Sequence, residues 1–138
     1  MRLNSFTYSL ILILAFQIQN TFANDPYISE IVSANNKSLR DNFDESSDWI
    51  EIYNPSDKPL NLLDWGLSDN PLNPQKWIFP SIEIQPKDFL IVHASGNNIA
   101  EPDKPLHASF RLSRLGEYLS LSKPDGTLID EFTPNFPP

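Results

Sequence analysis

The chain has 138 residues, 13 prolines, 4 glycines, no cysteine and a formal net charge of −8 at pH 7. This length suits one domain, and the absence of cysteine excludes disulfide bonds and thiol chemistry. Nucleic acids and anionic lipid surfaces reward clustered Lys and Arg, so the acidic charge argues against both as partners.

The first 23 residues have the three parts of a secretory signal peptide. Arg2 supplies a positive start, residues 8–16 form an apolar run, and residues 21–23 place small side chains at a cleavage site. The apolar run is too short to span a bilayer, although an interfacial or membrane-anchoring helix is an alternative interpretation. We therefore expect a product that starts at Asn24 and is secreted, periplasmic or held at the cell surface, without inserting into the membrane.

Beyond the signal peptide, apolar side chains recur with a period of two, which is typical of β-strands. The first strand is expected at residues 27–32, where the Ile31-Val32 pair interrupts strict alternation and suggests a β-bulge. The second, at residues 48–54, is rich in aromatic and β-branched side chains. One of its faces carries Ile50 and Ile52, and the other carries Trp49, Glu51 and Tyr53. We expect a central strand covered on both faces, with Trp49 or Tyr53 near the surface.

The later strand patterns are separated by turns rich in Pro, Asn, Asp and Gly. In chain order they lie at residues 60–63, 65–68, 76–79, 82–84, 89–94, 107–112, 118–121 and 127–132. The near-continuous apolar run at 89–94 predicts a strand buried on both faces, and Pro124-Asp125-Gly126 predicts a tight hairpin. No segment shows the period of an amphipathic helix, so the pattern predicts an all-β protein, a β-sandwich of about eight or nine short antiparallel strands.

Several segments, in this order, resemble the lamin tail domain family. They are residues 28–31, 47–55, 62–69, 76–80, 94–96, 116–121, 125–126 and 130–132. The resemblance covers residues 27–134 and implies an immunoglobulin-like β-sandwich. The family includes the tails of nuclear lamins and exported bacterial proteins with hydrolase, nuclease or adhesion modules. The signal peptide indicates the exported, bacterial-type branch, and the chain has no heptad rod. The resemblance implies no catalytic residues.

The domain boundaries follow from these patterns. We expect the lamin-tail-like domain to span residues 24–134, and residues 135–138 to begin a linker or a truncated C-terminal portion. Prolines at 137 and 138 cannot extend a ladder inside a sheet, which favours a chain that continues in a longer protein.

The segment between the first two strands carries the best candidates for a metal site. Asp41, Asp44, Glu45 and Asp48 place four carboxylates within eight residues, and Ca²⁺ takes six to eight oxygen ligands. The spacing does not fit an EF-hand loop, and no glycine supplies its sharp turn. A solvated loop is the plain alternative, and no other cofactor is expected.

The candidates for catalysis are few. His93 and His107 are the only histidines, and no third zinc ligand lies at a recognisable spacing. His93 is expected to be a hydrogen-bonded structural residue, since it lies in an apolar strand. Ser95 precedes Gly96 without the surrounding elbow motif of a nucleophile, and this position is better interpreted as a strand terminus.

The three tryptophans, Trp49, Trp65 and Trp77, are expected in the core, although a carbohydrate-stacking platform is an alternative. Residues 36–38 match a glycosylation sequon. Candidates for an exposed apolar contact patch are Leu72, Ile99 and Leu106, which lie in predicted loops.

Together these features predict a secreted, non-catalytic module for protein interaction or surface attachment. Its expected partner is a protein, a cell-surface component or a neighbouring domain of a longer chain. Two alternatives remain: an N-terminal accessory domain of a larger exported hydrolase or nuclease, and a calcium-dependent adhesion module.

Overall fold

The computed structural model describes residues 24–36 and 38–133, and ten short β-strands form its regular structure. They are β1 (Tyr27–Val32), β2 (Trp49–Tyr53), β3 (Leu60–Asn61), β4 (Gly66–Ser68), β5 (Trp77–Ile78), β6 (Glu83–Ile84), β7 (Phe89–His93), β8 (Leu106–His107), β9 (Leu119–Ser122) and β10 (Leu128–Phe132). The predicted signal peptide at residues 1–23 and the tail at 135–138 lie outside the described residues. In the described part of the chain, no helix is both long and apolar enough to cross a bilayer.

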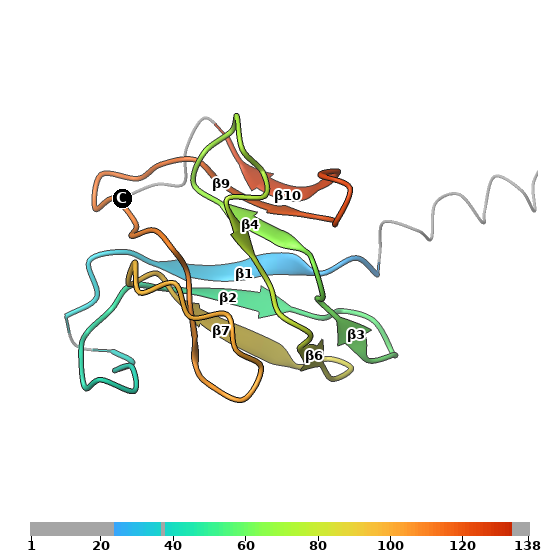
Figure 1. Cartoon of the computed structure of the whole chain (residues 1–138), viewed down its shortest axis with the longest axis horizontal. Coiled ribbons are helices and arrows are strands. Elements are labelled where there is room, and N and C mark those ends of the chain that lie inside the picture. The colour runs from blue at the N-terminus through green and yellow to red at the C-terminus, as the bar shows by residue number, and fades with distance from the viewer. Residues whose placement is uncertain (1–23, 37, 134–138) are drawn as a thin grey trace, which may run out of the picture.

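The strands form two four-stranded sheets and one small pair, which confirms the predicted all-β sandwich (Figure 1). One sheet has the order β1-β2-β7-β8, the other β10-β9-β4-β5, and β3 pairs with β6 at one end. Every pair is antiparallel except β7 with β8. This parallel pair departs from the predicted antiparallel arrangement because the polar segment 95–105 returns the chain to run beside β7 in the same direction.

The core lies between the two large sheets and uses one face of each strand. Ile50 and Ile52 of β2 are fully buried, as the alternation predicts, and Trp65 and Trp77 belong to the same core. Each fully buried side chain of this size contributes about 1.5–3 kcal/mol relative to exposure, before conformational entropy is counted. Burial therefore stabilises a domain that has no cysteine to cross-link.

A β-bulge shapes the opposite, outer face of β1. The pairing of β1 with β2 shifts between Ile28 and Glu30, so Ser29 is the extra residue. The bulge was predicted in this strand, but at the Ile31-Val32 pair. Its actual place lets Ile31 return opposite Ile50, and it sets Ser29 and Glu30 together opposite Glu51.

Strand β7 is not buried along both faces, so that prediction was wrong. Phe89 is 51% exposed and Leu90 and Ile91 are half-buried, whereas Val92 and His93 are buried. The outer face of the sheet is therefore open where β7 begins and covered where it ends. The predicted hairpin at Pro124-Asp125-Gly126 is confirmed, with Gly126 at φ +83° and Lys123 N–H bonded to Thr127 O.

Candidate functional site

The outer face of the β1-β2-β7-β8 sheet has two contrasting ends. At the end we call the covered end, Trp49, His93 and His107 lie beneath the described part of the loop that joins β1 to β2 (residues 33–36 and 38–48). At the end we call the open end, Tyr27, Tyr53 and Phe89 face solvent beside Ser29, Glu30 and Glu51. In Figure 1 the open end lies where β1 begins and β2 ends, beside β3 and β6.

The covered end is built on paired residues of three neighbouring strands. Trp49 pairs with His93, and His93 with His107, so their side chains lie in one row across β2, β7 and β8. The two imidazole rings are stacked with centroids 5.0 Å apart. The loop closes over the row where Ser38 Oγ accepts a hydrogen bond of 3.3 Å from Trp49 Nε1. Trp49 is consequently only 8% exposed, although it lies on the outer face and outside the main core.

His107 connects the loop to the sheet through both ring nitrogens. Its Nε2 donates to Asn42 Oδ1 at 2.7 Å, and its Nδ1 accepts from Ser95 Oγ at 2.8 Å. Ser95 Oγ also accepts from the N–H of Asn97 at 3.1 Å, and the ring of Phe43 packs 5.4 Å from the imidazole. This order of groups resembles a catalytic relay; His107 is fully buried, and Ser95 is 5% exposed at the edge of a pocket between the loop and the sheet end. Their hydrogen bonds hold the loop in place.

Burial controls the charge state of both histidines. Desolvation lowers the pKa of His93 below its usual value, and the neighbouring His107 lowers it further, while Asp41 opposes the change. Desolvation also lowers the pKa of His107, again opposed by Asp41. The structural role predicted for His93 agrees with its buried, stacked ring. Its predicted hydrogen bond is absent at Nδ1, which is buried without a partner.

Asp41, the first calcium candidate, organises the loop that covers this end. Its Oδ1 accepts from the N–H groups of Phe43 and Glu45, and its Oδ2 accepts from Ser47 Oγ at 2.6 Å. Burial alone would raise the pKa of Asp41, but these hydrogen bonds hold it below the usual value. A solvated loop residue was one interpretation of Asp41, and the structure instead buries it as the centre of a turn.

Two of the other three calcium candidates, Asp44 and Asp48, have separate partners. Asp44 is exposed and lies 3.4 Å from the guanidinium of Arg40, and Asp48 Oδ1 accepts from the N–H of Asn35. Glu45 and Asp48 line a pocket of about 380 Å³, and the lining also includes Arg111 and Arg114. Among the described residues, no group of three or more His, Cys, Asp or Glu is placed to hold one metal ion. Calcium binding stays a prediction, with no shared carboxylate site to carry it here.

The open end carries a row of three aromatic side chains, which we call the aromatic row. Tyr27 pairs with Tyr53, and Tyr53 with Phe89, across β1, β2 and β7. The ring centroids are 5.5 Å and 4.6 Å apart, with interplanar angles of 67° and 34°. Tyr27 is 43% exposed, Phe89 is 51% exposed and Tyr53 is half-buried. The described part of the chain thus leaves an aromatic surface in contact with solvent.

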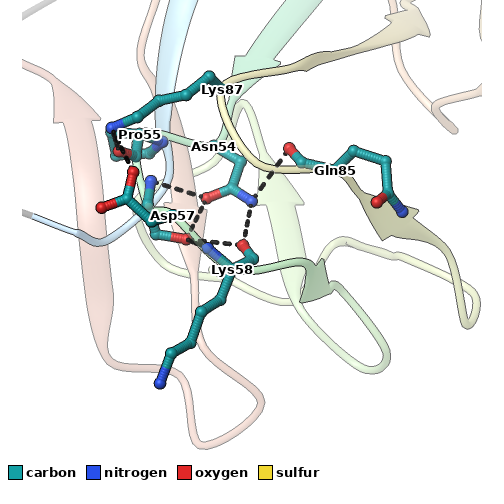
Figure 2. Close-up of polar contacts among 7 residues, drawn as sticks. Asn54, Pro55, Asp57, Lys58, Gln85 and Lys87 are labelled. Carbon is teal, nitrogen blue, oxygen red and sulfur yellow. Dashed lines mark hydrogen bonds and ion pairs between the residues drawn. The ribbon is translucent and has the colours of Figure 1, made fainter.

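Asn54 holds the turn at the end of β2 through its side-chain hydrogen bonds (Figure 2). This side chain is fully buried; its Nδ2 donates to the carbonyls of Lys58, Ile84 and Gln85, at 2.8, 3.0 and 3.2 Å. Its Oδ1 accepts from the N–H and the hydroxyl of Ser56. The amide therefore joins the turn after β2 to the turn before β7, and these turns directly flank Tyr53 and Phe89.

Lys87, in the turn before β7, forms an exposed ion pair with Asp57. Lys87 has φ +60°, and its Nζ donates to Pro55 O and lies 3.4 Å from Asp57 (Figure 2). The positive charge closest in sequence to Phe89 thus contacts the turn that follows β2.

The residues proposed as an apolar contact patch do not gather in one place. Leu72 is 92% exposed in a turn and Ile99 is half-buried, but Leu106 is only 2% exposed. The assignment of Leu106 to a surface patch was wrong, because Leu106 lies in β8, pairs with Val92 and faces the core.

Sequence alternation placed Tyr53 on the outer face, but it did not identify Tyr27 and Phe89 as its exposed neighbours. Both could have been found from the sequence, because each begins an expected strand that pairs with the end of the strand containing Tyr53.

Two comparisons with known proteins bear on this arrangement. A family model described as the Lamin Tail Domain matches residues 19–135, most of the chain, and the match begins inside the predicted signal peptide. A search of curated proteins returned no match. The family is one of immunoglobulin-like domains without a catalytic role, in agreement with the fold described above.

Proposed function

We propose that this chain, which belongs to the lamin tail domain family, is an exported, non-catalytic interaction module whose contact surface is the open end. Residues 1–23 would direct it out of the cytoplasm, in keeping with the exported, bacterial-type branch of the family. Its partner is a protein, a cell-surface component or a neighbouring domain, and not a nucleic acid.

The aromatic row is the observation that carries this proposal. Aromatic side chains are enriched in protein interfaces because they bury a large area with few rotatable bonds. Tyr27 and Phe89 are exposed, yet they lie on a sheet held in place by Asn54 and by cross-strand pairing. A rigid, exposed apolar surface is the feature expected of a docking site.

The hydrogen bonds and packing of Ser95, His93 and His107 also support a non-catalytic module. Ser95 and His107 bind the covering loop, and the ring of His93 is stacked and buried. None of the three lies at the open end. This distribution supports an interaction role for the domain.

Photo-crosslinking in the producing cells tests the contact surface. A benzophenone amino acid replaces Phe89 at the open end in one variant and Leu72, which is 92% exposed, in a matched control. We expect a discrete crosslinked species from position 89 and none from position 72. Equal crosslinking from both positions, or none from position 89, would contradict the proposal.

N-terminal sequencing of the exported product tests the route. We expect a chain that starts at Asn24 in the extracellular or envelope fraction. A product that keeps residues 1–23 and stays in the cytoplasm would rule out export.

A further inference from the structure

We infer that the open end binds an extended, positively charged polypeptide segment with Lys or Arg at alternate positions. This inference rests on the proposed interaction function and specifies the chemistry of the partner. It follows from the angles between the aromatic rings, from the carboxylates beside them and from the spacing of the two groups.

The ring geometry favours a compact cation over a sugar. A flat sugar chain makes its fullest contact with rings whose faces lie nearly in one plane. Here Tyr27 and Tyr53 are inclined by 67°, and Tyr53 and Phe89 by 34°. An ammonium or guanidinium group instead needs one ring face within about 6 Å and gains from a second ring at an angle to the first.

The carboxylates next to the aromatic row lack ionic partners. Glu30 pairs directly with Glu51 across β1 and β2, and like charges in this arrangement are destabilising. Ser29 Oγ donates to Glu51 Oε1 at 2.7 Å, which supplies a hydrogen bond but no positive charge. Within residues 24–36 and 38–133, no ion pair includes either glutamate. A cationic partner would relieve this repulsion.

The spacing between the aromatic row and the Glu30–Glu51 pair specifies an extended partner. Glu51 and Tyr53 lie on the same face of β2, two residues apart. Two residues of a strand rise about 6.6 Å, which is also the distance between alternate side chains of an extended peptide. A segment running along β2 can therefore place one cation over the aromatic row and the next beside Glu30 and Glu51.

The overall charge assists the encounter. The chain carries a net charge of −8, so a cationic segment is attracted from a distance and binding weakens as salt rises. Such long-range attraction is nonspecific, and a test must separate it from contact at the open end.

Fluorescence anisotropy of capped, labelled peptides with the full chain provides that test. The probe alternates Lys and Ser; one control has the same composition with all Lys in one block, and another replaces Lys with Glu. We expect the alternating Lys peptide to bind tightest, the block peptide more weakly and the Glu peptide not at all. Equal affinity for the alternating and block peptides would overturn the predicted spacing.

Matched variants locate the contact. Tyr53→Leu and Phe89→Leu should each weaken binding about two- to fivefold, since an exposed cation–π contact is lost. Glu51→Gln should weaken it by a similar factor, whereas Asp103→Asn, which removes the same charge from an exposed loop, should change it less. Equal losses from Glu51→Gln and Asp103→Asn, or full affinity in Tyr53→Leu, would overturn the inference. Near-ultraviolet circular dichroism confirms that each variant is folded.

The two proposals fail in different ways. Crosslinking from position 89 without binding of the Lys–Ser peptide would leave the interaction function standing and remove the cationic partner. Loss of crosslinking from position 89 would remove the function itself, and the peptide result would then describe adventitious binding.

Discussion

The covered end and the open end of the outer face use the same strand and similar side chains, yet only one is buried. Trp49 and Tyr53 lie on the same face of β2, four residues apart. Trp49 is closed over by Ser38 and the loop around Asp41, whereas Tyr53 has only its aromatic neighbours. The difference shows that alternation decides which face a side chain occupies, and a covering loop decides whether that face meets water.

Truncation of one aromatic at each end should give the largest contrast. We expect Trp49→Ala to lower the free energy of unfolding by about 3–5 kcal/mol, as for other buried aromatic residues. Phe89→Ala, at an exposed site, should cost about 1 kcal/mol or less. Urea denaturation of both variants measures the two values. Similar losses would mean that the two ends are equally buried in solution.

Asn54→Ala should destabilise the open end and leave the covered end unchanged. It removes the donor to three carbonyls and the acceptor for Ser56, and unsatisfied buried groups cost about 1–3 kcal/mol. We also expect faster amide hydrogen exchange at Tyr53 and Phe89, but not at His93. Unchanged exchange at Tyr53 and Phe89 would show that Asn54 does not hold the aromatic row.

Mild acid should weaken the covered end selectively. The pKa values of His93 and His107 are lower in the folded protein than the usual 6.5, so the unfolded chain binds protons more readily. Their contribution to stability is therefore complete above pH 6.5 and is lost as the pH falls below it. Melting temperatures measured between about pH 8 and 5 should fall on the acid side. His93→Gln should flatten this fall, and an identical profile in the variant would contradict the assignment.

Calcium should have the smallest effect. The hydrogen bonds of Asp41 are made within the loop, and two arginines line the pocket that contains Glu45 and Asp48. We expect millimolar Ca²⁺ to leave the melting temperature almost unchanged. A rise of several degrees that disappears in Asp44→Asn and Asp48→Asn would establish the calcium-dependent module, since a ligand that binds only the folded state must stabilise it.

Local patterns in the sequence were enough to predict the sandwich and its core. Ile50, Ile52, Trp65 and Trp77 are buried as period-two alternation indicates. The turn at Asn54 was also predictable, because its bond to Ser56 is local. Its bonds to Ile84 and Gln85 join residues about thirty positions apart, and no local pattern reports such a contact.

The candidate site was harder to predict, because it depends on which part of the outer face a loop covers and on which residues pair across the strands. Nothing local to residues 89–94 reveals that only the end of β7 is covered, and so Phe89 was expected to be buried. The carboxylates of Asp41 and Asp48 match the composition of a cation site, but the sequence does not reveal that Asp41 Oδ1 accepts from the N–H of Glu45 and Asp48 Oδ1 from the N–H of Asn35. Residue type alone does not distinguish a ligand from the centre of a turn.

The bulge at Ser29 gives the first strand one residue more than its pairing with β2 requires. Because the bulge adds one residue to β1, deleting Ser29 would leave a regular strand in which Ile28 still pairs with Ile52 and Tyr27 with Tyr53. Deleting Ser29 and Glu30 together would instead move every side chain before them to the opposite side of the pleat, with Ile28 turned to solvent and Tyr27 turned inward. A single-codon deletion at the bulge would thus keep Ile28 in the apolar interior and Tyr27 at the surface, whereas a two-codon deletion would displace both.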